Sequence, residues 1–102
     1  MPVSNHDYVL MERGAPTTAR PTPGADRFGL QIVPNEATES ALVVLQGSIN
    51  GADWVDLATA TTKDPMVGAG GTAKSPVIRY LRVIARTLTG DGASVAVHVV
   101  AK

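Results

Sequence analysis

The chain has 102 residues and no cysteine. The lack of cysteine excludes disulfide bonds, thiolate catalysis and zinc sites built on cysteine. Aromatic residues are also scarce, at 4% of the chain, with one tryptophan, one phenylalanine and two tyrosines. Proteins that bind single-stranded nucleic acid stack bases on several aromatic side chains, so this composition disfavours that class.

An excess of charge of either sign is missing as well. Nine basic and nine acidic residues give a formal net charge of zero. A nucleic-acid-binding domain collects phosphates with a basic face, so we expect no nucleic-acid partner. No stretch approaches the roughly 20 apolar residues of a membrane helix, and the first residues lack the pattern of a secretory signal. We therefore expect no membrane association, no signal peptide and synthesis in the cytoplasm.

Groups of residues that carry catalysis or bind metals are not evident. The two histidines, His6 and His98, are far apart and have no second ligand at the spacing of a helical metal site. Asp53 and Asp56 lie beside a tight turn, where solvated or turn-capping carboxylates are common. The sequence predicts no catalytic residue, no metal site and no cofactor, and we expect a protein that is not an enzyme.

One glycine-rich stretch, VGAGGTAKSP at residues 67–76, comes within one residue of the phosphate-binding pattern G-x-x-x-x-G-K-[ST]. Ala73 replaces the second glycine, and Pro76 and a β-branched stretch follow where that motif needs a helix. We interpret residues 61–76 as a surface loop.

The sequence favours strands over helices, because β-branched residues, glycine and proline are spread along its whole length. Six candidate strands cover residues 6–12, 27–34, 41–48, 53–59, 77–87 and 94–102. Turn signals separate them about every ten residues. This spacing predicts an all-β fold, a small antiparallel β-sandwich or jelly-roll-like domain.

Residues 14–26, GAPTTARPTPGAD, contain three prolines and favour extended chain without a core of its own. We therefore divide the chain into an N-terminal strand with a Pro/Thr-rich arm, residues 1–26, and a sandwich domain, residues 27–102. The first strand could pair with its own sheet or with that of a neighbouring subunit.

The stretch LQGSINGADWVDL, residues 45–57, is typical of a hairpin. Asn50 and Gly51 accept the positive φ of a tight turn, Ser48 can hydrogen-bond across the turn, and Trp54 can fold over the loop. We assign these four residues a structural role. The pattern resembles the S-x-[DN]-G-x-x-W hairpin of discoidin-like, galactose-binding-type jelly rolls, and IRYLRVIA, residues 78–85, resembles another strand of the same domains.

The same hairpin and strand, in a short cysteine-free chain rich in Ala, Thr, Val and Gly, also resemble small β-sandwich proteins of tailed bacteriophages. That resemblance implies a non-enzymatic virion structural protein, a capsid decoration, cement or head- or tail-associated subunit that binds the outside of the head. Its partners would be copies of itself, as dimer or trimer, and the major capsid protein. The candidate interface residues are Pro16, Arg20, Pro21 and Pro23 of the arm, with Arg82 and Arg86.

Two alternatives remain open. Strand alternation places Arg82 and Arg86 on one face with Tyr80, and Arg79 on the face of Leu81, so the arginines could instead form a solvated strand face. The resemblance to galactose-binding-type jelly rolls implies a different function, a carbohydrate-binding module or tail-associated adhesin.

Overall fold

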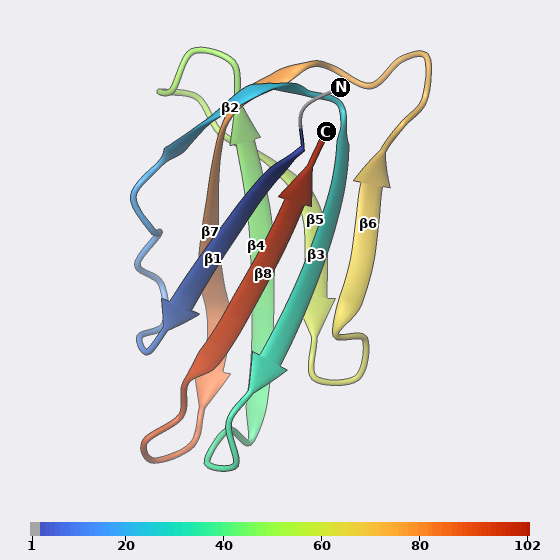
Figure 1. Ribbon diagram of the computed structural model, residues 1–102. Coiled ribbons are helices and arrows are strands. Elements are labelled where there is room, and N and C mark those ends of the chain that lie inside the picture. The colour runs from blue at the N-terminus through green and yellow to red at the C-terminus, as the bar shows by residue number, and fades with distance from the viewer. Residues whose placement is uncertain (1–2) are drawn as a thin grey trace.

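The chain is a sandwich of two four-stranded antiparallel sheets (Figure 1). The computed structural model describes residues 3–102, except the side chain of Pro23. The first sheet has the order β1-β8-β3-β6 and the second sheet has the order β2-β7-β4-β5. The strands are β1 (Ser4–Leu10), β2 (Arg20–Ala25), β3 (Arg27–Pro34), β4 (Ser40–Ser48), β5 (Val55–Thr61), β6 (Met66–Gly70), β7 (Ile78–Thr89) and β8 (Val95–Ala101). The expected all-β sandwich is confirmed.

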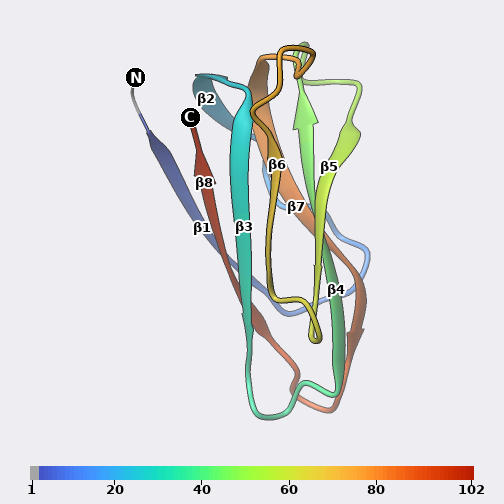
Figure 2. The same ribbon diagram turned by 90° about the vertical axis from the view of Figure 1, so that its right-hand side faces the viewer.

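The core lies between the two sheets, as the edge-on view in Figure 2 shows. Strand alternation sends every second side chain inward, and β8 does so with Val95, Val97 and Val99 while His98 points outward. Leu30 of β3 and Leu45 of β4 are among the largest fully buried side chains. Removing this apolar surface from water is the main force that holds the sheets together.

One strand lies where the sequence predicts only loop. Met66–Gly70 forms β6, which pairs with β3 at the edge of the first sheet. Glycine and alanine have low strand propensity, and such a strand depends on backbone hydrogen bonds to its neighbour. The prediction of a loop over residues 61–76 is wrong for these five residues because their pairing partner is distant in sequence.

The Pro/Thr-rich segment lies along the edge of the second sheet. Gly14 and Thr17 donate backbone hydrogen bonds to the carbonyls of Ala85 and Val83, at 2.7 and 2.9 Å. Residues 20–25 then form β2, which pairs with β7. Proline suits this position, because the outer side of an edge strand needs no N–H donor. The first strand, β1, pairs with β8 of its own chain.

The start of β7 departs from the expected alternation. Ile78 is buried and Arg79 is exposed, although simple parity places Arg79 inward with Leu81. The neighbouring strand β2 pairs irregularly with this part of β7, between Pro21 and Ala25. Strict alternation assumes regular pairing, which this end of the sheet does not have.

Candidate interaction surfaces

The hairpin between β4 and β5 has the turn chemistry that its sequence suggests. Ser48 Oγ accepts a hydrogen bond from the backbone N–H of Gly51 at 2.8 Å, and Gly51 has a φ of 79°. Asn50 Oδ1 accepts hydrogen bonds from the backbone N–H groups of Ala52 and Asp53, both at 2.9 Å. These bonds satisfy the donors of the turn and fix its shape.

Two aromatic side chains accompany this turn. A Cβ added at Gly51 would lie 3.6 Å from the Cε2 atom of Tyr80, so this ring lies beside the turn. Trp54 packs against Arg82, whose guanidinium carbon lies 4.3 Å from the centre of the indole ring. Trp54 immediately precedes β5 and shares strand parity with the outward-facing Asp56, which places it on the same face as Arg82.

A polar network covers the outer face of the second sheet. Gln46 of β4 is opposite Arg82 of β7 and Asp56 of β5 in the strand register. The Gln46 amide donates to Asp56 Oδ1 at 2.9 Å and accepts from Arg82 Nε at 2.8 Å. Arg86 donates two bonds to the Asp56 carboxylate, at 3.0 and 3.1 Å. Four residues from three neighbouring strands therefore form one network.

The charged groups of this network are paired with one another and with Gln46 of the same sheet. The hydrogen bond from Gln46, with the charge of Arg86, holds the pKa of Asp56 below its usual value. The Arg86–Asp56 pair joins β7 to β5 across β4, and both side chains remain about half exposed, at 49% and 45%. Arg82 and Arg86 thus lie together as predicted from strand parity, but their hydrogen bonds go to their own sheet.

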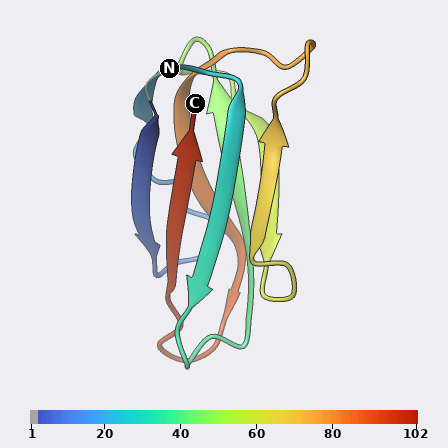
Figure 3. The same cartoon turned by 45° about the vertical axis from the view of Figure 1, so that its right-hand side comes forward.

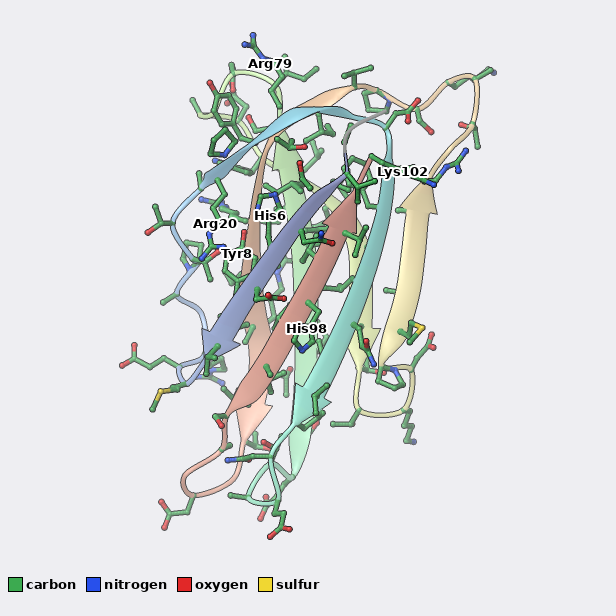
Figure 4. All side chains as sticks on the ribbon, in the orientation of Figure 1. His6, Tyr8, Arg20, Arg79, His98 and Lys102 are labelled. Atoms are coloured by element: carbon green, nitrogen blue, oxygen red, sulfur yellow. The ribbon has the colours of Figure 1, made fainter. Side chains whose placement is uncertain are left out.

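The arm residues lie along the edge of the sandwich next to β1. Pro16, Arg20 and Pro21 are exposed, whereas the side chain of Pro23 lies outside the described part of the structure. The guanidinium carbon of Arg20 lies 4.5 Å from the centre of the Tyr8 ring, so this side chain connects the two sheets (Figure 4).

Buried polar atoms accompany Arg20 at this edge. His6 Nε2, Tyr8 Oη and Thr22 Oγ1 are buried and have no hydrogen-bond partner among the described residues. Burial, together with the charge of Arg20, lowers the pKa of His6, and burial raises the pKa of Tyr8. A buried polar atom without a hydrogen-bond partner lowers the stability of the fold. This edge of the core therefore contributes less to stability than the aliphatic centre.

A hollow of about 420 Å³ opens beside the hairpin, at one end of the sandwich. Gly47 and Ile78 line it together with the exposed apolar side chains of Ile49 and Val55, and Asp53 is the one ionisable residue in its lining. An added Cβ at Gly47 would lie 2.6 Å from Leu57 Cδ1, so a larger residue there requires the Leu57 side chain to shift.

The outer face of the first sheet, formed by β1, β8, β3 and β6, is the surface that sequence reasoning missed (Figure 3). Four large apolar side chains are exposed there: Val9 (68%), Met66 (66%), Val33 (49%) and Val100 (44%). His98 Nδ1 lies 2.7 Å from Asp7 Oδ1 on the same face. Beside them is a shallow hollow of about 170 Å³ at Gly29. Alternating valines indicate a strand but do not tell which strands lie side by side.

Metal-binding groups and membrane-spanning helices were sought among the described residues, 3–102. These residues hold no group of three His, Cys, Asp or Glu side chains that could bind a metal ion. They also hold no helix that is long and apolar enough to cross a membrane.

Comparison with known proteins gives a likeness of fold. No family model matches the chain, and no curated protein matches it. A solved structure, the SPBc2 prophage-derived protein YomS, superposes with a TM-score of 0.53 and 9% sequence identity. The chain shares its fold with YomS. The likeness covers 100% of this chain and 96% of that one.

Proposed function

We propose that this chain is a non-enzymatic structural protein of a bacteriophage particle, a capsid decoration protein that self-associates and binds the outside of the head. The observation that carries the proposal is the exposed apolar face of the first sheet, with Val9, Val33, Val100 and Met66. Apolar patches of this kind on small proteins mark contact surfaces. Burying one such side chain contributes about 1–2 kcal/mol, so the face favours an assembled state.

The likeness to a prophage-derived protein over its full length supports a phage context for this sandwich. A neutral net charge supports it too, because charge repulsion does not oppose packing of many copies. A subunit that binds only the assembled capsid stabilises that capsid by mass action. Because Arg82 and Arg86 hydrogen-bond within the chain, we place the main contact on the first sheet rather than on these arginines.

Binding to capsids tests this function directly. Purified protein is mixed with expanded capsids assembled from the major capsid protein of the same genome, and the two are sedimented together. We expect saturable binding that unlabelled protein competes away, and capsids that melt at a higher temperature. Protein that stays in the supernatant at every concentration would refute the proposal.

The polar network favours one second candidate, the carbohydrate-binding module or adhesin. Trp54, Gln46, Asp56 and Arg82 combine an indole with polar groups on one sheet face, as sugar-binding surfaces do. Arg82 already lies over the indole ring, which limits stacking of a sugar. A saccharide-dependent shift of Trp54 fluorescence would favour this candidate, and an emission indifferent to a panel of saccharides would reject it.

A further inference from the structure

We propose that β6 is a docking edge, to which one extended segment of the capsid subunit adds as a new outermost strand of the first sheet, with a large apolar side chain opposite Gly68. This inference rests on the proposed function, because it names the part of the chain that contacts the capsid and the form that the partner takes there. Three features of the structure support it: the backbone groups of β6, the residues at the other sheet edges and the glycines beside β6.

The backbone of β6 pairs with β3 on one side, and hydrogen bonds at its two ends show which residues take part. The Ile32 N–H donates to the carbonyl of Pro65 at 2.9 Å, and the Gly71 N–H donates to the carbonyl of Asp26 at 2.8 Å. In an antiparallel pair, the residues that exchange hydrogen bonds recur at every second position. The odd-numbered residues of β6 therefore direct their N–H and carbonyl groups toward β3.

The even-numbered residues Met66 and Gly68 direct the same groups to the other side, where the sheet ends. No strand among the described residues pairs with that side of β6. Both residues are exposed. Two N–H donors and two carbonyl acceptors, repeated every second residue, match the groups that an extended polypeptide presents. A small molecule or a lipid surface does not present that alternation, so we infer that the partner is a strand.

The other three sheet edges carry features that oppose the addition of a strand. On one edge, β2 contains Pro21 and pairs irregularly with β7. On another, β5 has an extra residue, Leu57, where its register with β4 shifts. The third edge strand, β1, presents the exposed charge of Asp7. The sequence of β6, MVGAG, contains no charged residue and no proline, and its register with β3 is regular. This chain therefore leaves one of its four edges open.

Glycines beside the open edge indicate which side chain the added strand carries. Gly68 is opposite Gly29 of β3, and a Cβ added at Gly29 would meet nothing within 4 Å. A hollow of about 170 Å³ lies at Gly29, and the exposed apolar side chains of Met66 and Val100 also line it. A large apolar side chain on a neighbouring strand can cover an edge glycine. From a strand about 4.8 Å away, such a side chain would lie over Gly68 and extend toward this hollow.

Hydrogen exchange of the full chain, free and bound to expanded capsids of the same genome, tests the added hydrogen bonds at single residues. The amides of Val67 and Ala69 bond to β3, so we expect them to be protected in both states. The amides of Met66 and Gly68 should exchange freely in the unbound chain, and at least tenfold more slowly on the capsid.

Two variants close the edge. Met66→Lys places a charge on β6, and Gly68→Pro removes an N–H group that β3 does not use. The matched control is Met11→Lys, the same change outside the strands, at a side chain that is 72% exposed compared with 66% for Met66. The melting temperature of each variant shows whether it is folded. Met66→Lys and the exchange experiment decide the matter if Gly68→Pro unfolds.

We expect Met11→Lys to bind capsids as the wild type does, and both edge variants to bind at least tenfold more weakly. Edge variants that bind like the wild type would overturn the inference and leave the proposed function in place. The same holds if the amides of Met66 and Gly68 exchange equally fast on and off the capsid. A wild type that binds no capsids at any concentration would refute the proposed function, and the docking edge with it.

Discussion

Replacing Gln46 with methionine tests whether the polar network stabilises the second sheet. Gln46 is 7% exposed, donates to Asp56 at 2.9 Å and accepts from Arg82 at 2.8 Å. Methionine has a similar length and keeps the packing of the side chain, but it makes neither hydrogen bond. The substitution therefore removes two bonds to charged groups and leaves the volume of the site almost unchanged.

Hydrogen bonds to charged groups contribute about 1.5–3 kcal/mol each when they are buried. Asp56 is about half exposed, which lowers the contribution, so we take about 1 kcal/mol for each bond and expect a loss of about 2 kcal/mol. In a domain of about 100 residues this corresponds to a melting temperature lower by about 10 °C. Arg82 also loses its hydrogen bond to Gln46, which holds its guanidinium group over the indole ring. Trp54 therefore becomes more accessible to a collisional quencher.

Urea unfolding followed by circular dichroism gives the loss of stability, and acrylamide quenching reports on Trp54. The matched control is Gln31→Met, the same change at an exposed position of the first sheet. We expect little effect there. A loss of stability below about 0.5 kcal/mol for Gln46→Met, with unchanged quenching, would show that water replaces both hydrogen bonds without loss of stability.

Two further predictions concern the backbone and the edge of the core. Gly70→Ala should lower the free energy of unfolding by about 3 kcal/mol or more, because Gly70 has a φ of 82° and a Cβ would overlap the carbonyl oxygen of Asp26. Gly29→Ala, at a position with open space, should change the melting temperature little in the same thermal melt. Burial lowers the pKa of His6 below 6.5, so the unfolded state binds more protons and the wild type loses stability as pH falls below about 6.5. His6→Phe should flatten the dependence of the urea midpoint between about pH 7.5 and 5.5, and an unchanged slope would count against a buried neutral His6.

Much of the fold follows from local patterns in the sequence. Alternating apolar residues identify β3, β7 and β8, and the Asn-Gly turn identifies the hairpin that joins β4 to β5. The edge strands β2 and β6 do not follow, because proline and glycine carry no local strand signal. These two strands exist because a neighbouring strand offers backbone partners, and that neighbour is known only once the sheet order is known.

The sequence predicts the surfaces less well than it predicts the fold. Strand parity places Arg82 and Arg86 on one face, but their partners Gln46 and Asp56 come from two other strands. Likewise, the contact between Trp54 and Arg82 joins residues from two distant parts of the chain, and the hairpin motif alone does not indicate it. The exposed apolar face of the first sheet depends on the order β1-β8-β3-β6, in which strands from both ends of the chain are neighbours. No local pattern reports that order.

The proposed role, a structural subunit on the outside of a phage head, requires that the chain bind the assembled capsid. Co-sedimentation with expanded capsids of the same genome, read as bound copies per capsid against free protein, measures that binding. We expect saturation at a fixed number of copies, and capsids that resist higher temperatures when the protein is bound. Capsids that bind no protein, and that melt at the same temperature with and without it, would rule out this role.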